Sequence, residues 1–170
     1  MRKIVTIIIL TLTLTSIGQN TSIDRIDNKV NKINSDTSLT MIQFDLNKVY
    51  DLTNNGSGIF KIWKSPSEIK KITQLSYHSY GKTETTVFLE NGQPLLIIEN
   101  ENHFNLNTTS SEPEYEKEMK TVYQDRIYCI SWDLDPIHVE TIGQRILTEG
   151  ICGLSDYSGI LEKGIELTKE

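Results

Sequence analysis

Three residues near the middle of the chain have the types and spacing that could carry chemistry. Glu99, Glu101 and His103 alternate along the sequence, and alternate residues of a β-strand point to the same face. Carboxylate oxygens gathered on one face would bind a hard cation such as calcium. Two carboxylates could instead act as acid and base in hydrolysis. The simpler interpretation is that these acids mark the point where a strand leaves the core for water.

A turn upstream of these residues predicts which strand lies beside them. Asn91-Gly92 is the strongest short hairpin signal in the chain, because both positions of such a turn need a positive φ. A two-residue turn there places Glu84 opposite Glu99, and like charges facing each other across two strands are destabilising unless something compensates them. Aligning a later segment, which is similar in sequence, brings Asp133 and Asp135 to the same edge. The predicted calcium-type cluster is therefore Glu84, Glu99, Glu101 and His103.

The two cysteines permit one further covalent feature. Cys129 and Cys152 could form a disulfide in an oxidising compartment, which would stabilise the fold by about 3 kcal/mol. Cys129 lies in an apolar run, where a buried free thiol is equally ordinary. Both alternatives stay open at this point.

Other chemistries lack the residues they need. The sequence has no G-x-S-x-G segment, no paired histidines or cysteines at zinc-ligand spacing, and no glycine-rich loop followed by Lys-Ser or Lys-Thr. We therefore predict no catalytic residue and no bound cofactor, apart from the calcium considered above.

The elements that would position these residues are short strands and two terminal helices. Three similar segments predict hairpins that together form a sheet, since one hairpin cannot bury its apolar face. They are IFKIWKSPSEIKKI, TTVFLENGQPLLII and KTVYQDRIYCIS. Ile23, Ile26, Val30 and Ile33 form one apolar stripe at helical spacing. Asp135-Pro136 predicts the start of a helical tail that resumes in SDYSGILEKGIELTKE. The expected fold is α+β: an antiparallel β-meander of about six strands with an N-terminal amphipathic helix and a C-terminal helical tail.

Two-residue turns at Gly81-Lys82 and Asn91-Gly92 predict the two faces of the sheet. With those turns, Phe88 lies opposite both Leu75 and Leu95. One face is then predicted to be the core, covered by the N-terminal helix; its residues are Leu75, Tyr77, Phe88, Leu95 and Ile97. Aromatic residues could either fill this core or line a binding face. They are Tyr77, Tyr80, Tyr123, Tyr128 and Trp132.

Three runs of the sequence carry a resemblance to a known group. INSDTSLTMIQFDL, ENENHF and YQDRIYCISWD resemble segments of secreted Bacteroidota proteins that carry repeated tyrosine and Asn-Gly hairpins. The resemblance spans most of residues 19–170 and implies a hairpin sheet in a secreted protein. It implies no activity. This chain has Val87-Phe88 and Val122-Tyr123 in place of the usual aromatic pair.

The N-terminus and the net charge predict location and exclude some partners. Residues 1–18 have a basic start, a short apolar stretch and a small-x-small site, the pattern of a cleaved secretory signal. Removing Arg2 and Lys3 leaves 15 basic against 23 acidic residues, a net charge of about −8, which disfavours nucleic acid and anionic membrane surfaces. We expect residues 19–170 to form one secreted or periplasmic domain, with no membrane insertion after cleavage.

These observations predict an exported, non-catalytic binding or protein-interaction module that meets a protein partner through one sheet face. The alternative is a hydrolase that uses a carboxylate pair, Glu99 and Glu101, at the sheet edge. The two hypotheses differ in whether the acids converge in an accessible concave pocket.

Overall fold

The computed structural model describes residues 22–51, 57–107, 109–146 and 154–169, without the side chains of residues 155 and 156. Seven strands form one antiparallel sheet in which each strand pairs with its neighbours in the sequence. The strands are β1 (Thr40–Asp45), β2 (Ser57–Lys64), β3 (Ile69–His78), β4 (Gly81–Glu90), β5 (Gln93–His103), β6 (Lys120–Tyr128) and β7 (His138–Gly143). The helices are the N-terminal helix (residues 22–35), α2 (Leu46–Tyr50) and α3 (Ser155–Leu167). None of these helices is long and apolar enough to cross a membrane.

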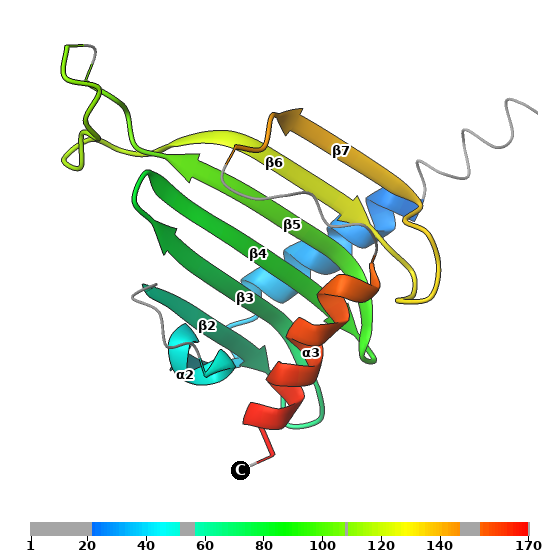
Figure 1. The fold of residues 1–170 in the computed structure, drawn as a ribbon. Coiled ribbons are helices and arrows are strands. Elements are labelled where there is room, and N and C mark those ends of the chain that lie inside the picture. Colours follow the sequence, from blue (N-terminus) through cyan, green and yellow to red (C-terminus); the bar gives the residue numbers. More distant parts are fainter. Residues whose placement is uncertain (1–21, 52–56, 108, 147–153, 170) are drawn as a thin grey trace, which may run out of the picture.

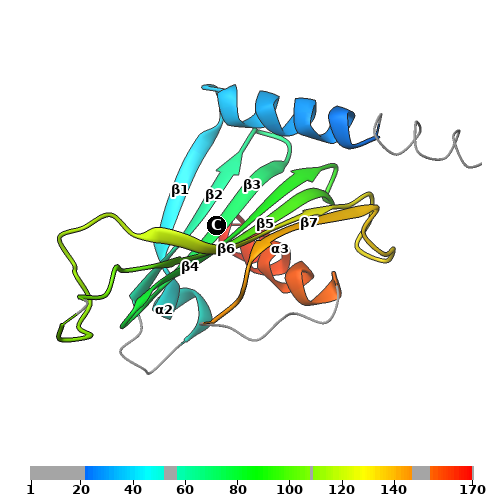
Figure 2. The ribbon, with the colours of Figure 1, turned by 90° about the horizontal axis from the view of Figure 1, so that it is seen from above.

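The helices lie on both faces of the sheet. Helix α3 crosses one face diagonally, with the short α2 beside it, and the N-terminal helix lies behind the sheet (Figure 1). Seen from above, the N-terminal helix and α3 are on opposite sides of the twisted strands (Figure 2). The predicted fold class, an α+β meander with a helix near each end, is confirmed, with seven strands instead of about six.

Each face has its own apolar core. Under α2 and α3 the buried residues include Phe60, Ile62, Ile72, Val87, Leu89, Ile97, Ile127 and Cys129. Under the N-terminal helix, Ile26 and Val30 pack on Phe88, Leu95, Leu96 and Tyr128, with Ile23 and Ile33 at the margin. The predicted apolar stripe of that helix therefore does cover part of the sheet.

A β-bulge beside the Asn91-Gly92 turn changes which residues share a face. The turn itself is confirmed, with φ of 53° at Asn91 and 73° at Gly92. Leu89 pairs with Pro94, but Phe88 pairs with Leu96, so Leu95 is an extra residue in β5. One extra residue moves every later side chain of a strand to the other face. The prediction that Ile97 shares a face with Phe88 is therefore wrong, and Ile97 lies under α3 instead.

The turn between β3 and β4 also differs from the prediction. His78 pairs with Gly81, so the turn residues are Ser79 and Tyr80, and Leu75 lies opposite Glu84 instead of Phe88. Gly81 is the first residue of β4, and the neighbouring strand β5 passes very close to it. A Cβ at Gly81 would lie 2.1 Å from the carbonyl oxygen of Asn102.

The third predicted hairpin is wrong. Strand β6 runs unbroken through Gln124, Asp125 and Arg126, and its partner is β7. Strand β7 occupies the region where Asp135-Pro136 predicted a helix. β-Branched Val139, Thr141 and Ile142 favour extended backbone, and this preference prevails over the helix-start signal.

Two glycines of α3 provide a stability test. A glycine inside a helix costs about 0.5–1 kcal/mol relative to alanine. Nothing lies within 4 Å of a Cβ built at Gly159, whereas a Cβ at Gly164 would lie 2.6 Å from Cδ1 of the fully buried Ile72. Gly159→Ala should therefore raise the urea midpoint of unfolding. Gly164→Ala should lower it, because overpacking a core costs about 1–3 kcal/mol. Equal shifts in the same direction would contradict this packing of α3.

Candidate functional site

A buried ionic network lies on the α3 side of the sheet around Glu99. The Glu99 side chain is 9% exposed and accepts a hydrogen bond from Nη2 of Arg145, which is 17% exposed. The same Nη2 is 3.6 Å from Oδ2 of Asp125, and the guanidinium stacks 4.4 Å from the ring centre of Tyr123. Burial alone would lower the pKa of Arg145, but the hydrogen bond and charge of Glu99 raise it above its ordinary value. Arg145 therefore stays charged and neutralises Glu99.

Hydroxyl groups complete this network around Asp125. The Tyr123 hydroxyl donates to Oδ2 of Asp125, and the Thr141 hydroxyl donates to Oδ1 at 2.6 Å. Burial, together with the hydrogen bond to Asp125, raises the pKa of Tyr123 to about 12. Burial and the charge of Glu99 also raise the pKa of Tyr157 on α3. Both phenols thus remain protonated at neutral pH, which suits hydrogen-bond donors and not catalytic bases.

Glu101 and His103 form a second polar group one step along β5. Glu101 is 2% exposed and accepts a 2.8 Å hydrogen bond from the backbone N–H of Ile146. Nε2 of His103 is 3.9 Å from the same carboxylate oxygen and is buried, with no hydrogen-bond partner among the described residues. On the neighbouring strand, Thr83 pairs with Glu101 and its hydroxyl lies 3.0 Å from Nε2 of His78.

The Glu99 network and the Glu101 group hold the segment that follows β7 against the sheet. Arg145 and Ile146 lie two and three residues after the end of β7, and they contact Glu99 and Glu101 of β5. A hydrolytic carboxylate pair must be reached by substrate, whereas Glu99 and Glu101 as whole residues are only 7% and 2% exposed. Neither one lines the four main hollows that the described residues form. The geometry supports a structural role for the pair.

The predicted convergence of four acidic and histidine residues does not occur. Glu84 pairs with Asn100, while Glu99 pairs with Thr85, so Glu84 and Glu99 lie on opposite faces. The expected alignment of Asp133 and Asp135 is also wrong, because the residue opposite Glu99 on β6 is Asp125. Asp133 and Asp135 are exposed in the loop after β6. Among the described residues, no three His, Cys, Asp or Glu side chains are arranged to hold a metal ion. The calcium site remains a prediction that no longer has support from Glu84.

The other predicted features are placed as follows. Cys129 is fully buried, its thiol lies 3.4 Å from the Ile127 carbonyl oxygen, and burial raises its pKa to about 12. The thiol is therefore protonated at neutral pH. Cys152 lies outside the described residues, so the disulfide remains a prediction. Of the five aromatic residues, Tyr123 and Tyr128 are buried, Trp132 is half-buried, and Tyr77 and Tyr80 are exposed. They do not form one common face.

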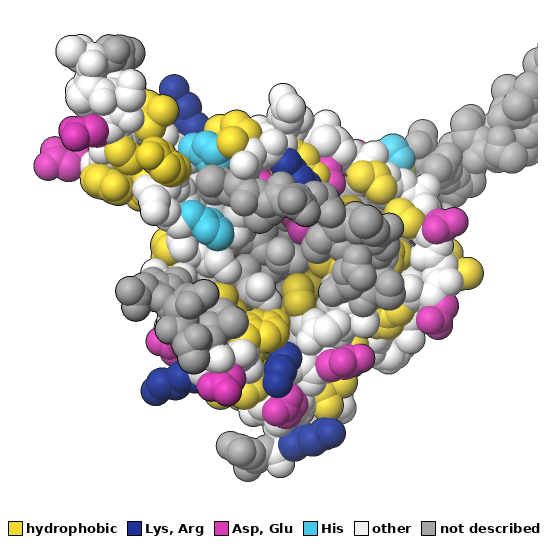
Figure 3. Space-filling view, viewed as in Figure 1, with side chains coloured by type: hydrophobic (Ala, Val, Ile, Leu, Met, Phe, Trp, Pro, Cys, Tyr) yellow, Lys and Arg dark blue, Asp and Glu magenta, His cyan; other side chains and the backbone are white. Residues whose placement is uncertain are grey.

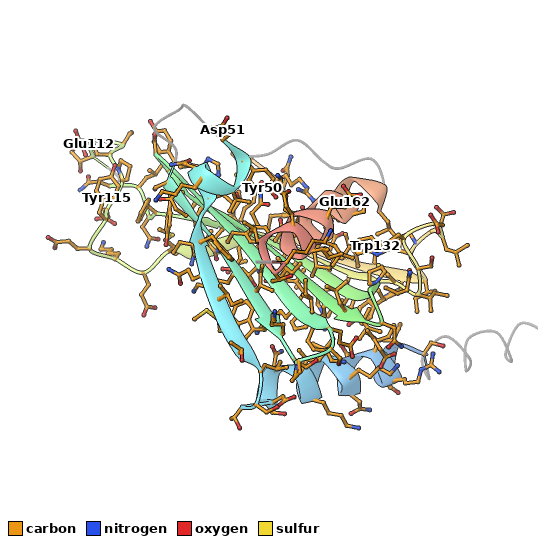
Figure 4. All side chains as sticks on the ribbon, turned by 90° about the horizontal axis from the view of Figure 1, so that it is seen from below. Tyr50, Asp51, Glu112, Tyr115, Trp132 and Glu162 are labelled. Atoms are coloured by element: carbon orange, nitrogen blue, oxygen red, sulfur yellow. The ribbon has the colours of Figure 1, made fainter. Side chains whose placement is uncertain are left out.

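A groove of about 840 Å³, lined by described residues, lies between α2 and α3. Its floor is formed by Gln74, Ser76 and Thr85, and its walls by residues of the two helices; these wall residues are Leu46, Tyr50, Tyr157, Gly159, Ile160, Glu162, Lys163 and Glu166. Figure 4 shows Tyr50 on α2 and Glu162 on α3 on the same side of the sheet, opposite the N-terminal helix. On this face, hydrophobic side chains are bordered by both acidic and basic ones (Figure 3).

The groove presents hydrogen-bonding groups beside apolar walls. The Tyr50 hydroxyl donates to Oε1 of Gln74 at 2.7 Å, which fixes the orientation of that amide. Among the described residues, the hydroxyls of Ser76 and Thr85 make no hydrogen bond. At the rim, Lys163 pairs with Glu166 at 2.8 Å. Sequence reasoning missed this groove because its walls come from α2 and α3, which are more than a hundred residues apart.

The comparisons with known proteins give no relative for this chain: no family model, no curated protein and no solved structure matches it.

Proposed function

We propose that the protein is an exported, non-catalytic binding module whose groove between α2 and α3 receives a neutral polar ligand. The groove carries the proposal. Its volume of about 840 Å³ lies within the range of about 300–1,000 Å³ typical of small-molecule sites. Export rests on the signal-like pattern of residues 1–18, which lie outside the described residues. The protein partner expected from the sequence remains a prediction.

The lining of the groove favours an uncharged ligand with hydroxyl or amide groups. Ser76 and Thr85 offer hydroxyls that can donate and accept, and Gln74 offers its amide. At the rim, Lys163 and Glu166 neutralise each other, and the exposed Glu162 adds one negative charge that disfavours anions. Leu46 and Ile160 provide apolar walls against which the ligand can exclude water. A charged ligand would find no uncompensated opposite charge on the floor.

The experiment blocks the groove without disturbing the fold. Nothing lies within 4 Å of a Cβ at Gly159, so Gly159→Phe can place its ring in the groove, and Gly159→Ala is the matched control. We expect D-glucose or N-methylacetamide to cause saturable NMR shifts of the Gln74, Ser76 and Thr85 amides. Gly159→Phe should abolish these shifts and Gly159→Ala should keep them. Shifts that survive Gly159→Phe, or no saturable shift in the unmodified protein, would contradict the proposal.

The hydrolase alternative is weaker because of access. It requires substrate to reach Glu99, which is paired with Arg145, and Glu101, which is engaged by the Ile146 backbone. Both residues are buried, and each carboxylate already accepts a hydrogen bond from the chain after β7. We therefore do not propose hydrolysis as a second function.

A further inference from the structure

The face of the sheet opposite α3 is only partly covered. The N-terminal helix packs on Phe88, Leu95, Leu96 and Tyr128. Beside it lies a hollow of about 350 Å³ over β2 to β5. Its lining includes Lys61, Trp63, Lys71, Leu75, Glu84 and Ile98, and all six are half-buried. This hollow is on the opposite side of the sheet from the groove described above.

Two lysines share this hollow, and neither forms an ion pair with a described residue. Trp63 pairs with Lys71 across β2 and β3, and Lys61 pairs with Thr73, so the two lysines are diagonal neighbours on one face. The ion pairs formed among the described residues involve neither of them. Lys71 instead contacts neutral groups: its Nζ is 4.0 Å from the ring centre of Trp63 and donates to Oδ1 of Asn34 at 3.1 Å.

The electrostatics of the hollow oppose those of the chain as a whole. The chain has a net charge of −6, whereas the lining has two lysines and a single acid, Glu84. Burial lowers the pKa of Lys71; the charge of Glu84 acts in the opposite direction, and the weaker effect of Lys61 lowers the pKa again. With two half-buried lysines and one acid, the hollow keeps an excess positive charge that is unfavourable when partly buried, and an anion placed between the lysines would offset it.

The other residues that line the hollow indicate the chemistry of the rest of the ligand. Trp63, Leu75 and Ile98 are apolar and partly exposed beside the two ammonium groups. A small inorganic anion would leave these surfaces in water. An anion attached to an apolar body would cover them, which adds a favourable contribution for each apolar area removed from water.

We propose that this hollow is a binding site for a small carboxylate with an apolar body, the carboxylate lying between Lys61 and Lys71 and the body against Trp63, Leu75 and Ile98. Glu84 restricts the ligand to a single carboxylate, because its own charge repels a second one.

The two tryptophans of the chain make the test specific. Trp63 lines the hollow, whereas Trp132 is on the other side, where its indole N–H donates to the Gly92 carbonyl oxygen. In an NMR titration with 3-phenylpropionate, the Trp63 indole signal should shift to saturation and the Trp132 signal should stay. The neutral analogue 3-phenylpropionamide should bind at least about tenfold more weakly, because it cannot form charge-assisted hydrogen bonds with the lysines. Inorganic phosphate should also bind at least about tenfold more weakly, because it leaves the apolar lining in water.

Variants separate the site from general charge effects. Lys61→Met and Lys71→Met should each weaken 3-phenylpropionate binding about tenfold, and Glu84→Gln should strengthen it. Lys48→Met, which removes an exposed lysine of α2, should change nothing. Amide binding equal to carboxylate binding, phosphate binding equal to both, or an unchanged affinity in both lysine variants would each overturn the proposal.

Discussion

Arg145→Met should lower the free energy of unfolding by about 3–5 kcal/mol, the cost of removing one partner from a buried ion pair. Glu99 and Asp125 are 9% and 13% exposed in their side chains, and Arg145 lies within 4 Å of both. Without the guanidinium, two neighbouring carboxylates would remain buried without a nearby cation among the described residues. Urea unfolding at neutral pH, followed by circular dichroism, measures the loss.

Two further variants distinguish burial from charge alone. Arg126 pairs with Asp27 and Glu140, but these side chains are 29–45% exposed, so Arg126→Met should cost about 1 kcal/mol or less. Adding Glu99→Gln to Arg145→Met should restore part of the loss, since it removes one of the uncompensated charges. Similar losses in Arg126→Met and Arg145→Met, or strictly additive effects in the double variant, would show that the Glu99 network is not a buried ion pair.

The sequence predicts the class of fold well because its signals are local. Apolar spacing in residues 22–35, the Asn91-Gly92 turn, and the apolar runs of β2 to β5 each depend on neighbours in the chain, and all are present in the structure. Antiparallel pairing of β2 to β5 then needs only short turns. This part of the meander follows from these pieces without any long-range information, whereas the longer connections to β1, β6 and β7 do not.

The candidate site could not be predicted because it depends on register. The bulge at Leu95 is one residue long, yet it moves Glu99 and Glu101 to the α3 side and leaves Glu84 on the other. Pro94 has no N–H to donate, but nothing in the local sequence indicates whether the strand absorbs an extra residue beside it. Arg145 was missed for a similar reason: its role is visible only once β7 pairs with β6 and places it over Glu99.

Gly143 explains how the chain turns from β7 toward Glu99. Its φ is 77°, and its backbone passes so close to β6 that a Cβ would lie 1.9 Å from the carbonyl oxygen of Val122. The next residue, Gln144, donates its N–H to that same oxygen at 3.2 Å. Only a glycine permits this approach, and Arg145 and Ile146 follow immediately.

Gly143→Ala should therefore lower the free energy of unfolding by about 2–5 kcal/mol, the sum of the left-handed backbone strain and an overpacked contact. Gly92→Ala is the matched control. Its φ of 73° is nearly the same, but nothing lies within 4 Å of its Cβ, so it should lose only about 1–2 kcal/mol. Urea midpoints of both variants measure the difference. Because backbone strain is common to the two sites, the excess loss at Gly143 isolates the close approach of β7 to Val122. Equal losses would mean that β7 does not approach β6 as described, and the placement of Arg145 over Glu99 would fail with it.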